Sequence, residues 1–112
     1  MDKNLVCIKK NNLNKIGYDN LEQWMENPNH VYIGRDMTFF VKAAVGSKWQ
    51  NPFSVKKYGR DRCLQLYEKY LENNVDLINN LHLLENKILG CWCDENEKCH
   101  GQLLLQKLKY KK

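Results

Sequence analysis

Long apolar runs are missing from this sequence, and their absence excludes one class of protein. No stretch approaches the roughly 20 apolar residues that a helix needs to cross a bilayer, and the opening residues, MDKNLVCIKKNN, lack the apolar centre of a secretory signal. We therefore expect a cytoplasmic protein with no membrane contact. Internal repeats, low-complexity tracts and linkers are also missing, which favours one compact unit.

Arginine is scarce, and the positive charge is unevenly placed. Three of the 18 basic residues are arginine. Four of the five net positive charges come from lysines at the C-terminus: Lys107, Lys109, Lys111 and Lys112. Five minus four leaves a net charge of +1 for the rest of the chain. This distribution predicts, at most, weak and salt-sensitive contact between the tail and nucleic acid.

Chain length limits the domain organisation. With 112 residues the chain can form one hydrophobic core, but not two of ordinary size. Its hydrophobic and charged fractions, 43% and 28%, are those of a globular protein. We expect a single domain over 1–112, composed of an N-terminal extension at 1–29, a core at 31–108 and a basic tail at 109–112.

Apolar periodicity predicts alternating strands and helices. The strands are expected at 5–8, 30–34 and 87–93. The helices are expected at 21–25, 59–73, 76–84 and 100–108. The segment 37–45 fits a strand or a helix, whereas 46–53 and the Lys- and Asn-rich residues after the first strand indicate loops. This order favours an α/β fold, specifically a small Rossmann-like three-layer domain with a short, mostly parallel sheet. The carboxyl ends of the last two strands should then meet at one edge.

The segment 87–101, KILGCWCDENEKCHG, concentrates potential metal ligands. Three sulfurs and an imidazole, from Cys91, Cys93, Cys99 and His100, form an acceptable zinc ligand set. However, the C-x2-C spacing of a zinc knuckle is absent. The adjacent residues Cys99 and His100 diverge at a helix start, so one tetrahedron would need an irregular backbone. The odd total of five cysteines, three of them crowded together, favours reduced thiols over disulfides.

A second interpretation places Cys99 and His100 at the start of the last helix. Free backbone N–H groups and the positive end of the helix dipole lower a thiol pKa there and favour an anion such as phosphate. Cys99 is then a candidate nucleophile with His100 as its base, although sequence neighbours rarely face each other as a catalytic pair. The alternatives are plain packing for Cys91 and helix capping for His100.

The loop at 46–53, GSKWQNPF, is a second candidate binding segment. Its polar residues lie beside Trp49, whose flat ring could stack on a base or a sugar. Alternatively, Trp49 and Phe53 pin a rigid loop to the core. With arginines from two other segments, the expected ligand-binding residues are Arg35, Ser47, Lys48, Trp49, Asn51, Arg60 and Gly101.

Five motifs follow one another in a recognisable order. They are VYIGR at 31–35, GSKWQNPF at 46–53, GR at 59–60 with Tyr67, CWC at 91–93 and CHG at 99–101. Together they resemble the domain of unknown function 4326 family of phages, bacteria and large DNA viruses, over about 31–108. The family commonly has a shorter, proline-containing loop before CHG, from which 94–98 departs. The family is uncharacterised, so the resemblance implies no activity; for a viral protein it implies the host cytoplasm.

These observations leave three functions open. The leading hypothesis is a pocket that binds, and perhaps acts on, a nucleotide-like or phosphorylated ligand. In the second, zinc on the three cysteines and His100 stabilises a module that binds nucleic acid or protein. In the third, the chain is a viral accessory protein that binds a host factor and catalyses nothing.

Overall fold

The computed structural model describes residues 4–94 and 97–110. Its three strands are β1 (Leu5–Cys7), β2 (His30–Tyr32) and β3 (Ile88–Cys91). Its α-helices are α1 (Lys10–Lys15), α2 (Leu21–Met25), α3 (Val55–Tyr58), α4 (Arg60–Glu72), α5 (Val75–Asn80) and α6 (His100–Tyr110). A 3₁₀ helix, η1 (Leu81–Leu84), follows α5 directly. The expected α/β class is confirmed.

The sheet is parallel throughout, with strand order β1-β3-β2. Leu5 lies opposite Leu89, and Tyr32 lies opposite Gly90. Because the strands are parallel, all three carboxyl ends lie at the same edge. The last strand in the chain is therefore central, and the CWC motif leaves the sheet between its two neighbours.

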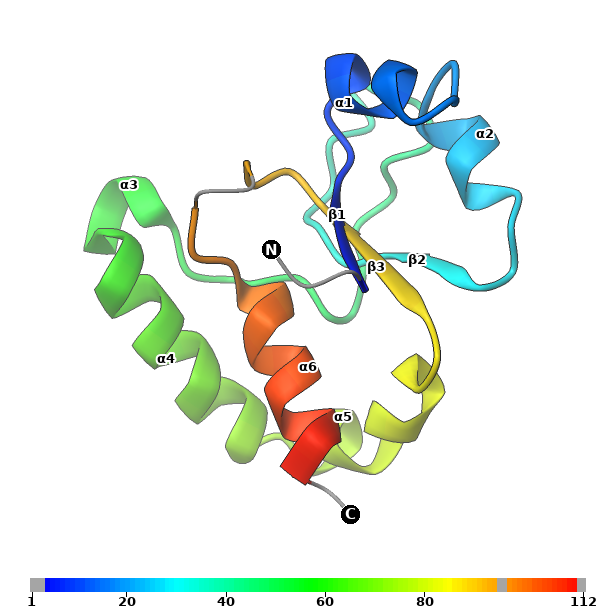
Figure 1. The fold of residues 1–112 in the computed structure, drawn as a ribbon. Coiled ribbons are helices and arrows are strands. Elements are labelled where there is room, and N and C mark those ends of the chain that lie inside the picture. The colour runs from blue at the N-terminus through cyan, green and yellow to red at the C-terminus, as the bar shows by residue number, and fades with distance from the viewer. Residues whose placement is uncertain (1–3, 95–96, 111–112) are drawn as a thin grey trace.

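Helices cover both faces of the sheet, which gives three layers. Figure 1 shows α1 and α2 on one side of the sheet and α4, α5 and α6 on the other. Side chains alternate along each strand, so Leu89 joins the larger core under α4 and α6, whereas Ile88 packs against the smaller core under α1 and α2. The expected three-layer arrangement is present.

Local sequence explains where the helices begin. The Asn20 side chain accepts a hydrogen bond from the Gln23 amide at 2.8 Å, and the Asn74 side chain accepts one from the Leu77 amide at 3.2 Å. Both asparagines cap helix N-termini in the usual way. The helix expected at 59–73 is α4. The helix expected at 76–84 is divided into α5 and η1.

Several segments differ from the sequence-based expectations, including the strand expected at 30–34, which ends at Tyr32. The residues after β1 form α1 where a loop was predicted. The segment 37–45 is neither a strand nor a helix; it is a turn-rich loop closed by a bond from the Met37 amide to the Ala44 carbonyl at 2.8 Å. The last strand ends at Cys91 instead of continuing to Cys93. The last difference places Trp92 and Cys93 in irregular backbone beyond the end of the sheet.

The outer segments of the chain contribute to the fold to different degrees. β1 pairs with the central strand, so the segment 1–29 supplies part of the sheet. At the other end, Lys107 of α6 forms an ion pair with Glu72 at 2.7 Å, and tail residues 111 and 112 lie outside the described residues. Within 4–94 and 97–110, no helix has both the length and the apolar character needed to cross a membrane.

Candidate functional site

A cavity of about 100 Å³ opens at the carboxyl edge of the sheet. It lies between the segments that follow β2 and β3, the first turns of α4 and α6, and the loop before α3. Its lining residues are Gly34, Arg35, Asn51, Phe53, Val55, Arg60, Cys63, Leu64, Cys91, Trp92, Cys93, Lys98, Cys99 and His100. In open α/β sheets this edge is where ligands bind.

Seven of the residues expected from the sequence line this cavity: Arg35, Asn51, Arg60, Cys91, Cys93, Cys99 and His100. They come from the ends of β2 and β3, the loop before α3, and the starts of α4 and α6. The parallel topology brings these distant segments together. Asn51 also has a structural role, because its side chain accepts a hydrogen bond from the Phe53 amide at 2.9 Å.

Three of the expected ligand-binding residues in the GSKWQNPF loop, Ser47, Lys48 and Trp49, do not line the cavity. Trp49 is 3% exposed and belongs to the larger core, and its carbonyl accepts a hydrogen bond from the Tyr67 hydroxyl at 2.8 Å. The Ser47 hydroxyl accepts a hydrogen bond from the Trp49 amide at 3.0 Å. The Lys48 ammonium lies 5.5 Å from the centre of the Trp49 ring. A ring this deeply buried has no free face for a ligand.

Gly101 packs α6 against the sheet. A Cβ atom at this position would lie 2.5 Å from Leu5 Cδ1 and 2.9 Å from Ile33 Cδ1, which is closer than such atoms can approach. The missing side chain therefore allows the helix to approach β1 and the residue that follows β2. The Gly101 amide also donates a hydrogen bond to Cys99 Sγ at 3.4 Å.

Three cysteine sulfurs converge at the floor of the cavity. The Sγ atoms of Cys91, Cys93 and Cys99 all lie within 4.8 Å of one another. Cys91 ends β3, Cys93 follows in irregular backbone, and Cys99 immediately precedes α6. Alternate residues along a strand face the same side, so Cys91 and Cys93 both reach Cys99, although Cys93 itself lies in irregular backbone after β3.

The three sulfurs do not have equal acidities. The hydrogen bonds that Cys93 receives from the Cys91 and Cys99 thiols, and then the nearby Arg60 guanidinium, lower the pKa of Cys93 despite its partial burial. The hydrogen bond from Cys91 to Cys93, together with burial, raises the pKa of Cys91. The lowered pKa makes Cys93 the most readily ionised of the three thiols. A thiol of this kind is either a soft metal ligand or a nucleophile.

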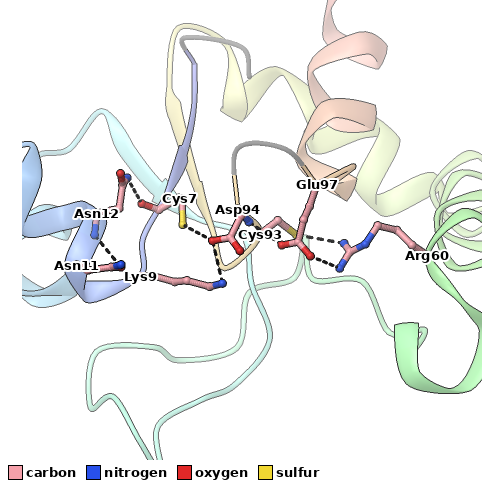
Figure 2. A network of polar contacts seen from close by, with 8 residues as sticks. All are labelled: Cys7, Lys9, Asn11, Asn12, Arg60, Cys93, Asp94 and Glu97. Atoms are coloured by element: carbon pink, nitrogen blue, oxygen red, sulfur yellow. Dashed lines mark hydrogen bonds and ion pairs between the residues drawn. The ribbon is translucent and has the colours of Figure 1, made fainter.

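Arg60, in the first turn of α4, contacts the segment between β3 and α6 that contains Cys93, as Figure 2 shows. Its guanidinium donates to the Lys98 carbonyl at 2.9 Å and lies 3.7 Å from Cys93 Sγ. It also forms an ion pair with Glu97 at 2.9 Å. The other carboxylate oxygen of Glu97 accepts a hydrogen bond from the Asp94 amide at 2.7 Å. Arg60 thus contacts residues near the start and near the end of the segment between β3 and α6.

His100 is oriented by the backbone of β2. Its Nε2 lies 2.9 Å from the Ile33 carbonyl oxygen, which can only accept a hydrogen bond, so Nε2 carries the proton. Burial lowers the pKa of His100, against the effect of this hydrogen bond, and keeps the ring neutral. The lone pair of Nδ1 then lies on the side of Cys99, 3.9 Å from its Sγ.

Sequence analysis missed Cys63, Trp92 and Lys98 as lining residues. Cys63 is buried in α4, and its sulfur accepts a hydrogen bond from the side-chain amide of Asn51 at 3.1 Å. Lys98 has no distinguishing sequence signal because it is one of fifteen lysines. Trp92, between two cysteines, could have been included from its position alone.

Comparisons with known proteins agree with this arrangement of motifs. The family model described as Domain of unknown function (DUF4326) matches residues 16–110. The chain belongs to this family. A relative in it, "Uncharacterized protein R718" of Acanthamoeba polyphaga mimivirus, is 37% identical over 84 residues, and this match takes in 68% of the chain and 64% of the relative. The chain thus covers less than two thirds of that viral protein. No solved structure matches.

Proposed function

We propose that this member of the DUF4326 family binds a small anionic group, such as the phosphate of a nucleotide or sugar phosphate, in the cavity at the carboxyl edge of the sheet. One observation carries the proposal. The lining includes three cationic side chains, Arg35, Arg60 and Lys98, and no aspartate or glutamate is among the lining residues. Such a site attracts and retains anions.

The size of the cavity limits what can enter. Pockets for small molecules commonly measure about 300–1,000 Å³, whereas this one measures about 100 Å³. A compact group such as phosphate fits this space, and a nucleobase does not. The rest of a larger ligand would lie outside the cavity, and the buried ring of Trp49 would not stack on it.

The cations differ in how strongly they are already neutralised. Arg60 pairs with Glu97, and Lys98 pairs with Asp61 at 3.0 Å. Arg35 is exposed and has no ion-pair partner within 4–94 and 97–110. We therefore assign Arg35 the largest share of the affinity for an anion.

The proposal covers binding and not turnover. The Cys99 thiol is 1% exposed, and Nε2 of His100 is occupied by a backbone carbonyl. Although both residues line the cavity, we therefore assign neither a catalytic role. The reduced cysteines favour a reducing compartment such as the cytoplasm for this activity.

The test is a thermal-shift screen with nucleotides and sugar phosphates, followed by calorimetry on any that bind. We expect Arg35→Gln to weaken binding about tenfold, because a charge-assisted hydrogen bond contributes about 1.5–3 kcal/mol. The matched control is Arg62→Gln, an exposed arginine of α4 outside the cavity lining, which should bind as the unaltered chain does. Failure of every probe at millimolar concentration, or an equal loss in both variants, would contradict the proposal.

A further inference from the structure

We infer that Cys91, Cys93 and Cys99 hold a zinc ion, with Nδ1 of His100 as the fourth ligand. The three sulfurs already lie within 4.8 Å of one another. In a tetrahedral site with Zn–S bonds of about 2.3 Å, the sulfurs stand about 3.8 Å apart. The edges of the sulfur triangle need to shorten by about 1 Å at most, which side-chain rotation can supply.

The ligand types select the metal. Three sulfurs and one imidazole nitrogen suit zinc, which favours thiolate and histidine ligands in four-coordinate sites. Calcium and magnesium need oxygen ligands, and the three sulfurs offer none. The inferred metal is therefore a zinc ion bound within the protein, not a cation held weakly by surface carboxylates.

His100 has the environment of a metal-binding histidine. Such a residue commonly donates its other ring N–H to a carbonyl or carboxylate, which fixes the ring and its tautomer. The Ile33 carbonyl does this for His100 at 2.9 Å. Nδ1 lies 3.9 Å from Cys99 Sγ, and tetrahedral zinc needs about 3.6 Å between a sulfur and a nitrogen ligand. Nδ1 does not lie within 4.8 Å of all three sulfurs, so the ring has to move toward them to complete the site.

The surroundings balance the charge of the inferred site. Three thiolates and one Zn²⁺ carry a net charge of −1. The Arg60 guanidinium lies 3.7 Å from Cys93 Sγ and offsets part of this charge, since it also pairs with Glu97. The Gly101 amide donates to Cys99 Sγ at 3.4 Å. Donors of this kind orient metal ligands and stabilise the thiolate form.

Simple packing of apolar cysteines does not account for the cluster. Cys7 and Cys63 are also buried, but their sulfurs are not part of it. The Cys63 thiol instead donates to the Phe53 carbonyl at 3.0 Å. Burial alone therefore leaves cysteines dispersed in this fold, and the three gathered sulfurs come from two segments that the sheet edge brings together.

The first experiment is elemental analysis of the protein purified under reducing conditions, then supplied with zinc and desalted. We expect about one zinc per chain, lost in Cys93→Ala and Cys99→Ala but retained in Cys7→Ala, the matched buried cysteine. Because the first two variants could misfold, zinc X-ray absorption of the unaltered chain is the independent measurement. It should show sulfur neighbours at about 2.3 Å. A folded chain that takes up no zinc, or zinc retained by either cluster variant, would overturn the inference.

The second experiment tests His100 through cobalt(II), which reports its ligand set by visible absorption. We expect His100→Ala to shift the cobalt bands and to weaken zinc binding at least tenfold. An unchanged spectrum with unchanged affinity would overturn the assignment of the fourth ligand. The inference is independent of the proposed anion binding, because metal content is measured without any phosphate compound and Arg35→Gln should leave it unchanged.

Discussion

At the scale of single residues, close approach between backbone and side chains controls the geometry around the cavity. Gly90 lies in the centre of β3, and a Cβ atom there would come within 2.7 Å of Ile8 Cγ2 and 2.7 Å of Trp24 Cη2. Both neighbours are almost fully buried, with exposures of 1%. Gly90 therefore fixes how tightly the smaller core packs on the strand that leads into the cysteine cluster.

Replacing Gly90 with alanine tests this packing. We expect Gly90→Ala to lower the free energy of unfolding by about 1–3 kcal/mol, because an extra methyl group in a close-packed core forces its neighbours apart. Urea denaturation followed by circular dichroism measures the change. Gln106→Ala, at an exposed position of α6, is the reference and should change stability by less than about 0.5 kcal/mol. Equal stability of the two variants would show that the neighbouring side chains rearrange to accept the methyl group, which would contradict this prediction.

At the scale of elements, short helices depend on their caps. α5 has six residues and lies between α4 and η1. A helix this short is marginal on its own, so the hydrogen bond from the Leu77 amide to the Asn74 side chain contributes much of its local stability. Leu77 in turn packs into the larger core.

Two adjacent asparagines allow a controlled test of this cap. We expect Asn74→Ala to destabilise the protein by about 1 kcal/mol, the usual cost of losing an N-terminal cap. Asn73→Ala alters an exposed side chain one position earlier and should have little effect. Chemical denaturation of both variants gives the comparison. Similar losses in the two would mean that the side-chain bond of Asn74 contributes nothing.

The elements also show what sequence could and could not predict. Parallel pairing and the meeting of strand ends followed from the order of apolar segments and the handedness of crossovers, so Arg35 and Cys99 were correctly expected near one another. The burial of Trp49 did not follow, because a loop aromatic can face the core or a ligand with the same local sequence. Residue type alone marked Cys93 as a potential zinc ligand, but the convergence of its sulfur with those of Cys91 and Cys99 depended on the path of the loop after β3, which periodicity does not encode.

At the scale of the whole molecule, the N-terminal segment and the later core form one sheet. Leu5 of β1 is 3% exposed and lies in the same core as Leu89 and Leu104. A single domain over 1–112 requires the N-terminal segment to unfold together with the rest of the chain. If that segment were a separate unit, a destabilising change in it would leave the remaining core folded. The number of unfolding transitions distinguishes these two cases.

A truncation in β1 tests whether the molecule unfolds as one unit. We expect Leu5→Ala to cost about 2–5 kcal/mol, as for other leucines removed from cores, with a single transition seen by fluorescence and circular dichroism alike. Leu83→Ala is the matched control, because Leu83 is 49% exposed. A second, separate transition in the Leu5 variant would divide the chain into two units.

The two outer strands of the sheet are short, which limits their pairing with strands of other molecules. β1 and β2 each pair with β3 on one side, which leaves their other sides as templates for additional strands. Each has only three residues, so an incoming chain would find few backbone groups to bond. Short edges are one of the devices by which proteins avoid aggregation, and this sheet resists growth into fibrils through its dimensions alone.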